Sequence, residues 1–205
     1  MNTVEKLLMN NLARSWLIEH YALPKLITLG KFSGQDTGKS LLEIGCGSGY
    51  GLSILLKHFR PALLHALDSD PKMIQISRRR LEKLVNKYPG TQTHVYLGDA
   101  AAIESTDNQY DHVFGFGVLH HIPEWQQSVR EIFRVLKPGG TVLLEESFAK
   151  FILHPFWRKI LDHPKENRFD AVELSRYLGQ VGFTNINYQQ SRNQFMGWLV
   201  AHKAG

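Results

Sequence analysis

The chain has 205 residues, 43% of them hydrophobic, a size and composition that fit one α/β domain with a sizeable core. The formal net charge of +5 permits anionic substrates, nucleic acid or an anionic membrane surface as partners, but demonstrates none of them. A single cysteine excludes an internal disulfide and disfavours a thiolate metal site, and no apolar run is long enough to cross a membrane. Because no leader-like segment opens the chain either, we expect a cytoplasmic protein.

The N-terminal residues 3–29 carry apolar side chains at helical spacing, and Pro24 marks a break or a new helix start. We therefore expect residues 1–30 to form a helical cap. From residue 39 the chain alternates between strand-like and helix-like segments. The predicted strands are 39–44, 62–68, 93–97, 110–116 and 140–146, and the predicted helices are 49–58, 71–87 and 124–135. This alternation predicts a parallel sheet with right-handed crossovers and helices on both faces.

The last part of the chain breaks this alternation. A helix over 170–180 ends at Gly182, and two strand-like runs at 183–190 and 194–202 follow with no helix between them. Two consecutive strands of this kind predict an antiparallel hairpin. The fold class is therefore α/β, and ligands of such sheets bind beyond the carboxyl ends of the parallel strands.

The first strand runs into a glycine-rich loop at residues 45–49, GCGSG, and a leucine-rich helix follows. This arrangement lets a ligand lie directly against the backbone, because glycines have no Cβ atom in the way. Cys46 fits the loop as a small side chain, and nothing in the pattern favours a nucleophilic role for it. The loop is the first candidate ligand site, and a tight turn without a ligand is the plain alternative.

Two other kinds of glycine loop fail on spacing. A dinucleotide-binding G-x-G-x-x-G motif needs its third glycine at the position of Tyr50 or of Leu52, so binding of NAD is disfavoured. The segment 33–40, SGQDTGKS, ends like a phosphate-binding P-loop, but its first glycine would fall on Ser33 and the loop leads into a strand. We interpret this segment as a polar turn.

The E-x-G-x-G-x-G spacing from Glu43 to Gly49 resembles the first motif of class I S-adenosylmethionine-dependent methyltransferases. Later segments resemble those of the family in the same order, namely L-G-D-A at 97–100, D-x-V at 111–113, L-H-H-x-P at 119–123 and L-K-P-G-G at 136–140. The resemblance implies a Rossmann-like, doubly wound, seven-stranded sheet that is mostly parallel with an antiparallel C-terminal strand. It also implies a single methyltransferase domain over residues 1–205.

The resemblance implies that S-adenosylmethionine binds at the carboxyl ends of the strands. Asp68 would accept hydrogen bonds from both ribose hydroxyls, and Asp99 would accept one from the adenine amino group. Asp70 is instead interpreted as the N-cap of the helix that Pro71 begins. The expected cofactor contacts are Glu43, Gly45, Cys46, Gly47, Gly49, Asp68, Ser69, Met73, Asp99, Ala100 and Phe116.

Methyl transfer is an in-line displacement, so the protein mainly has to align the reacting atoms in a dry site. A general base is needed only for a protonated acceptor, and His120 and His121 are the candidates because neutral imidazole titrates in the right range. Either histidine could instead cap the loop or pack under it. Related enzymes that bind magnesium carry an acidic pair where this chain has Gly117 and His120, so we expect no metal.

Residues 146–169, between a strand and a helix, form the expected substrate-side insertion and are rich in Phe, Trp, His and Lys. They suit a lid over an apolar acceptor such as a quinone or lipid, with a peripheral membrane contact or plain helix packing as alternatives. We expect Phe156 and Trp157 to contact the acceptor. Nucleic acid is disfavoured, since residues 114–117 lack the polar residue and two prolines of base-methylating enzymes.

We therefore expect an S-adenosylmethionine-dependent methyltransferase that acts on a small, apolar or aromatic, lipid-like acceptor. A partner subunit that binds the cofactor but does not transfer its methyl group is the main alternative, and an NAD-dependent oxidoreductase is the weaker one. Accumulation of the demethylated cofactor would separate the first two, because it requires turnover. The sequence names neither the acceptor atom nor the oligomeric state.

Overall fold

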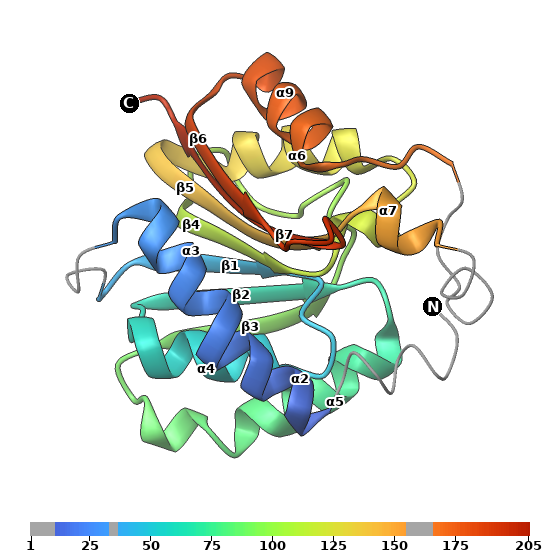
Figure 1. Cartoon of the computed structure of the whole chain (residues 1–205). Coiled ribbons are helices and arrows are strands. Elements are labelled where there is room, and N and C mark those ends of the chain that lie inside the picture. Colours follow the sequence, from blue (N-terminus) through green and yellow to red (C-terminus); the bar gives the residue numbers. More distant parts are fainter. Residues whose placement is uncertain (1–10, 33–36, 155–165) are drawn as a thin grey trace.

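The computed structural model describes residues 11–32, 37–154 and 166–205, in which seven strands form one sheet in the order β3-β2-β1-β4-β5-β7-β6 (Figure 1). The strands are β1 (Ser40–Ile44), β2 (Leu63–Asp68), β3 (Gln92–Leu97), β4 (Tyr110–Phe116), β5 (Leu136–Ser147), β6 (Phe183–Gln190) and β7 (Met196–Lys203). The first five pair in parallel, and β7 runs antiparallel to both of its neighbours. The predicted fold class, with its closing antiparallel hairpin, is confirmed.

Helices cover both faces of this sheet, as a doubly wound fold requires (Figure 1). They are α2 (Leu12–Leu17), the π-helix η1 (Ile18–Ala22), α3 (Leu23–Gly30), α4 (Tyr50–Phe59), α5 (Pro71–Glu82), the 3-10 turns η2 (Val85–Lys87) and η3 (Leu119–His121), α6 (Trp125–Val135), α7 (Ala149–Ile152) and α9 (Ala171–Val181). Among the described residues no helix is both long enough and apolar enough to cross a membrane.

Alternate residues of each central strand enter two separate hydrophobic clusters, because side chains alternate between the faces of a sheet. Leu42 and Val113 pack in one cluster with α6 and α9, whereas their neighbours Leu41 and Phe114 pack in the other with α3, α4 and α5. All four of these side chains have no exposed surface. A strand buried on both faces explains why these segments are near-continuous apolar runs in the sequence.

The N-terminal helical region is continuous from α2 to α3 but contains one wide turn. Within η1 the hydrogen bonding widens, and the N–H of Leu23 donates to the carbonyl of Ile18, five residues earlier. Pro24 follows at the second position of α3, where its missing N–H and its ring disturb the helical hydrogen bonds behind it. The expected break at Pro24 is therefore a π-helical turn directly before the proline.

Two predicted boundaries differ from the structure by more than two residues. The helix expected over 71–87 ends at Glu82, and a 3-10 turn follows at Val85–Lys87. The last parallel strand begins at Leu136 because that residue already pairs with Tyr110, although the register then shifts before Thr141 pairs with His112. The glycines of the L-K-P-G-G segment lie within this irregularity, where a simple strand pattern is lost.

Candidate active site

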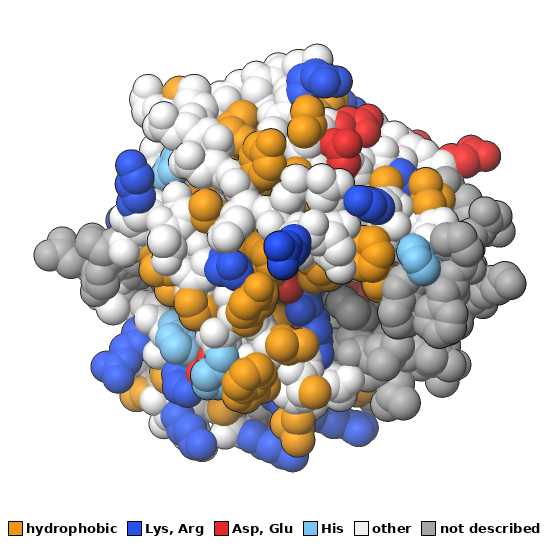
Figure 2. Space-filling model, in the orientation of Figure 1, with side chains coloured by type: hydrophobic (Ala, Val, Ile, Leu, Met, Phe, Trp, Pro, Cys, Tyr) orange, Lys and Arg blue, Asp and Glu red, His pale blue; other side chains and the backbone are white. Residues whose placement is uncertain are grey.

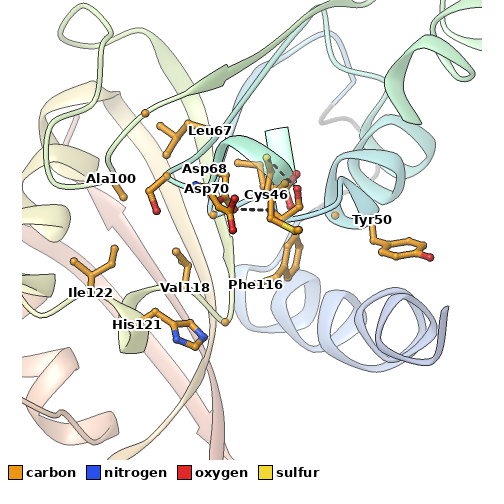
Figure 3. Close-up of a pocket in the computed structure, with 18 of the residues that line it drawn as sticks. Cys46, Tyr50, Leu67, Asp68, Asp70, Ala100, Phe116, Val118, His121 and Ile122 are labelled. Atoms are coloured by element: carbon orange, nitrogen blue, oxygen red, sulfur yellow. Dashed lines mark hydrogen bonds between the residues drawn. The ribbon is translucent and has the colours of Figure 1, made fainter. Parts of the chain in front are cut away.

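A pocket of about 480 Å³ opens at the carboxyl ends of β1, β2, β3 and β4. Its walls come from the glycine loop, from the residues that follow each of these strands, and from the N-terminal helix. Figure 3 shows Asp68, Asp70 and Cys46 close together, with the Phe116 ring below them and His121 and Ile122 on the opposite side from Tyr50. Ligands of doubly wound sheets bind at this edge, so the pocket lies where the topology predicts it.

The backbone of the glycine loop strongly favours glycine at Gly45 and Gly49. Gly45 and Gly49 have φ values of +65° and +81°, in the left-handed region that side chains disfavour. A Cβ on Gly45 would also lie 2.3 Å from Cγ2 of Val118, and one on Gly49 would lie 2.6 Å from Oγ of Ser77. Gly49 is the N-cap of α4 and does not line the pocket, unlike the other residues of the predicted cofactor set.

Asp68 binds the glycine loop to the end of β2. Its Oδ2 accepts a hydrogen bond from the backbone N–H of Gly47 at 2.8 Å, and its Oδ1 accepts one from the backbone N–H of Asp70 at 2.8 Å. Asp70 in turn accepts from the backbone N–H of Lys72 at 2.8 Å and is the N-cap of α5, as predicted. The Asp68 carboxylate also lines the pocket, so a ligand bound there would lie beside it.

Glu43 is a carboxylate with an exposed fraction of 2% in the wall of the pocket, and its Oε2 atom has no hydrogen-bond partner among the described residues. Burial, together with the nearby carboxylate of Asp68, raises the pKa of Glu43 well above its usual value. A buried acceptor without a donor costs stability unless a ligand supplies the donor. The position therefore favours a ligand that carries a cationic or N–H group.

The remaining predicted cofactor residues border the same space. Ser69 and Met73 follow the end of β2, and Asp99 and Ala100 follow the end of β3. Asp99 also accepts a hydrogen bond from the backbone N–H of Ala101 at 2.8 Å, which fixes the turn after β3. The thiol of Cys46 is buried, and burial raises its pKa, so it stays protonated and is a poor nucleophile.

The two histidines after β4 have different surroundings. His121 lines the pocket, whereas the His120 side chain is buried, with its Nδ1 atom 2.6 Å from Oε2 of Glu146. The Glu146 carboxylate also accepts from the backbone N–H groups of Leu119 at 2.9 Å and Val118 at 3.2 Å. Burial raises the pKa of Glu146 to about 7. His120 therefore attaches η3 to Glu146 of β5, and His121 alone of the pair lines the pocket.

Arg14 is a pocket residue that the sequence did not indicate. It comes from α2, and its guanidinium contacts both carboxylate oxygens of Glu145 at the end of β5, at 3.0 and 2.6 Å. Both side chains are largely buried, with exposed fractions of 10% and 4%. This bidentate pair fixes α2 over the pocket, and it brings Ile18 of the next turn into the lining. The helical spacing of 3–29 predicted a cap but not this contact.

Comparison with known proteins identifies the family. The family described as "Methyltransferase domain" matches this chain over residues 42–144, from β1 through the greater part of β5. The chain belongs to the class I S-adenosylmethionine-dependent methyltransferase family. The matched segment contains the glycine loop and the ends of β2, β3 and β4, so it includes most of the pocket.

Several methyltransferases of known name are similar to this chain. A fatty-acid O-methyltransferase of Mycolicibacterium smegmatis is 32% identical over 127 residues, which cover 62% of this chain and 44% of that protein. A demethylmenaquinone methyltransferase of Staphylococcus saprophyticus is 25% identical, with 82% and 78% covered. The chain therefore spans less than half of the first relative and more than three quarters of the second.

The solved structure of an S-adenosylmethionine-dependent methyltransferase from Aquifex aeolicus superposes with a TM-score of 0.72 at 18% identity. The match covers 98% of both chains. At this identity the likeness concerns the fold, which is shared over almost the whole of both methyltransferases.

The methyltransferase pocket fits S-adenosylmethionine as its cofactor. When bound, this cofactor supplies an electrophilic methyl group on a sulfonium. Its amino-acid part carries an ammonium, which is the kind of donor that the partnerless Oε2 of Glu43 requires. The glycine loop at Gly45 and Gly47, and the carboxylate of Asp68 in the pocket wall, would hold the rest of the molecule.

No group of three or more His, Cys, Asp or Glu side chains that could hold a metal ion occurs among the described residues. The expectation that this methyltransferase needs no metal remains a prediction. The predicted acceptor contacts Phe156 and Trp157 lie outside the described residues. Phe148, at the start of the same insertion, has an exposed fraction of 2% and packs against Phe169, so this ring belongs to the core.

Proposed function

We propose that this protein transfers the methyl group of S-adenosylmethionine to a small, apolar, lipid-like acceptor. The observation that carries the proposal is the buried side chain of Glu43, whose Oε2 has no donor in the described part of the chain and which borders a pocket walled by the glycine loop. A protein that only needed a tight turn here would have no reason to keep an unpaired acid in its interior. Membership of the family supports methyl transfer as the reaction, and the lining of the pocket supports an apolar acceptor.

Part of the pocket wall is apolar. Ile18, Phe116, Val118 and Ile122 contribute hydrocarbon or aromatic surface, and His121 adds one titratable group. Such a lining favours an acceptor with an apolar body and one polar reacting group. The relatives named for fatty acids and for demethylmenaquinone have acceptors of this description.

The residues of this chain would mainly align the acceptor with the methyl group and exclude water from the site. Phe116 and Ile18 exclude water, and the bidentate contact of Arg14 with Glu145 fixes the helix that covers the site. A carboxylate acceptor needs no base, whereas a hydroxyl acceptor must lose a proton. In that case His121 would accept the proton, because it is the titratable base among the apolar wall residues.

The test is a turnover assay with one acceptor at a time. The purified protein would be incubated with S-adenosylmethionine and either a long-chain fatty acid or a demethylated quinone, and the acceptor's gain of one methyl group would be measured by mass spectrometry. Glu43→Gln should lose at least about tenfold in affinity for S-adenosylhomocysteine, because the ligand's ammonium would favour the ionised form of Glu43 and a glutamine cannot ionise. Glu104→Gln, at an exposed acid outside the pocket, is the matched control.

Two results would overturn the proposal. If the protein bound the cofactor but formed no S-adenosylhomocysteine with any acceptor, apolar or hydrophilic, it would be a binding subunit and not an enzyme of this class. If turnover occurred only with small hydrophilic amines, the transfer reaction would stand and the lipid-like acceptor would be wrong. The assay therefore tests the reaction and the acceptor class separately.

A further inference from the structure

The N-terminal helix carries an unusual amount of exposed apolar surface. Leu12, Trp16, Leu17 and Tyr21 have exposed fractions of 76%, 59%, 46% and 49%. We call these four residues, together with His20, the N-terminal apolar face. Single exposed apolar side chains are ordinary, but several on two helical turns form a contiguous patch that water solvates poorly.

This face is distinct from the inward side of the same helical region, which other residues occupy. Arg14 and Ile18 point to the pocket, and Ala22 lies fully buried in the core. The wide turn of η1 allows both arrangements, since it keeps Tyr21 exposed while its neighbour Ala22 packs inside. The same helix thus presents one side to the pocket and an apolar side to solvent.

Aromatic and basic groups are interleaved at this surface. The Trp16 ring is stacked on the ring of His20, with centroids 5.0 Å apart. The ammonium of Lys25 lies 4.8 Å from the centroid of the Tyr21 ring and 4.7 Å from that of Trp198. Figure 2 shows hydrophobic side chains gathered over the N-terminal helix, with Lys and Arg side chains around them and few acidic ones on this face. Large aromatic rings beside cations suit the boundary between lipid headgroups and acyl chains.

We propose that the N-terminal apolar face docks on the surface of an anionic phospholipid bilayer. The net charge of +5 and the basic surroundings of the face match a negatively charged surface. A second copy of this chain is a poorer occupant, because in a symmetric dimer the same patch meets itself and brings Lys25 near its own copy. Docking would place the pocket, through Arg14 and Ile18, directly beside the lipid phase.

The reason for docking rests on the proposed lipid-like acceptor, which would enter from the bilayer. The docking itself needs no methyl transfer, so it can be measured without an acceptor. The assay is co-sedimentation of the whole protein with vesicles of phosphatidylcholine mixed with phosphatidylglycerol, and with vesicles of phosphatidylcholine alone. We expect binding to the anionic vesicles that weakens as salt is added.

The double variant Trp16→Ser/Leu17→Ser should lower the partition onto anionic vesicles at least about tenfold. Its matched control is Val172→Ser/Tyr188→Ser, which removes two apolar side chains of similar exposure, 52% and 43%, from α9 and β6. Both proteins should bind S-adenosylhomocysteine like the unaltered chain, because none of the four positions lines the pocket.

Three outcomes would overturn the inference. In the first, the unaltered protein does not sediment with anionic vesicles. In the second, both double variants bind these vesicles equally well. In the third, sedimentation velocity shows that Trp16→Ser/Leu17→Ser converts a dimer into a monomer. The last result would identify a second copy as the occupant. Failure of the proposed function looks different, since vesicle binding would then persist while no acceptor is methylated.

Discussion

Replacing Asp68 with asparagine tests two roles of this residue, which are to hold the glycine loop and to contact the cofactor. The carboxylate accepts one backbone hydrogen bond from Gly47 and one from Asp70, each at 2.8 Å, and it lines the pocket where the cofactor's ribose is expected. An asparagine has the same shape, but one oxygen becomes an NH2 group. That group would face one of the two backbone donors, so at least one of these hydrogen bonds must be lost.

The expected losses of stability and of cofactor affinity differ in size and are measured by different assays. A hydrogen bond to a charged group contributes about 1.5–3 kcal/mol, and since Asp68 is half-buried we expect a loss of unfolding free energy near the lower end, about 1–2 kcal/mol. Loss of the charge-assisted ribose contacts should cost about 2–3 kcal/mol of binding, or on the order of 30–100-fold in affinity. Denaturant unfolding measures the first, and calorimetry with S-adenosylhomocysteine measures the second.

Asp70→Ala is the control for this prediction. Its side chain caps α5 through the N–H of Lys72, so its loss should lower stability by about 1 kcal/mol and leave cofactor affinity nearly unchanged. If Asp68→Asn lowered the stability but bound S-adenosylhomocysteine within threefold of the unaltered protein, Asp68 would only hold the loop. The assignment of the ribose contact to the end of β2 would then be wrong.

Three further predictions follow from the site. Gly51→Ala should lower cofactor affinity at least about tenfold, because its Cβ would lie 1.9 Å from Oε1 of Glu43 and displace that carboxylate. At the control position Gly90, an added Cβ meets no atom within 4 Å, so Gly90→Ala should leave cofactor affinity unchanged. Burial raises the pKa of Glu146 to about 7, against an ordinary 4.5, so between these pH values the folded state keeps a proton that the unfolded chain has lost. The free energy of unfolding therefore falls as pH rises from 4.5 to 7. Glu146→Gln should remove up to about 3 kcal/mol of this pH dependence, measured by denaturant unfolding at a series of pH values. Turnover should survive EDTA, since the segment after β4 lacks the acidic pair of magnesium-dependent relatives; loss of activity that magnesium restores would contradict this.

The features that the sequence predicted well are those set by local rules. The apolar runs of the central strands and the glycines at 45–49 are strong signals, because a strand buried on both faces is mostly apolar and a left-handed backbone favours glycine. The N-cap role of Asp70 was equally local, since its partner Lys72 is two residues away. These rules located the fold and most of the pocket.

The features that it missed depend on contacts between distant residues. Arg14 and Glu145 are 131 positions apart, and His120 and Glu146 are 26 apart, so no spacing in either segment reveals them. The two histidines were therefore equal candidates as bases until the structure placed one on a buried carboxylate and the other in the pocket lining. Gly49 was similarly assigned to the cofactor from its motif, although it faces Ser77 and not the pocket.

The end of β5 explains how these distant contacts form one site. Glu145 and Glu146 are consecutive residues of a strand, so their side chains leave opposite faces of the sheet. Glu145 fixes Arg14 and with it the helix that covers the pocket, and Glu146 accepts the N–H groups of η3 that begin the His121 wall. Their strand neighbours on β7 hold this end in register on the far side. Arg14 and the turn that carries His121 are therefore both attached to one strand end, which the closing hairpin pairs on its other edge.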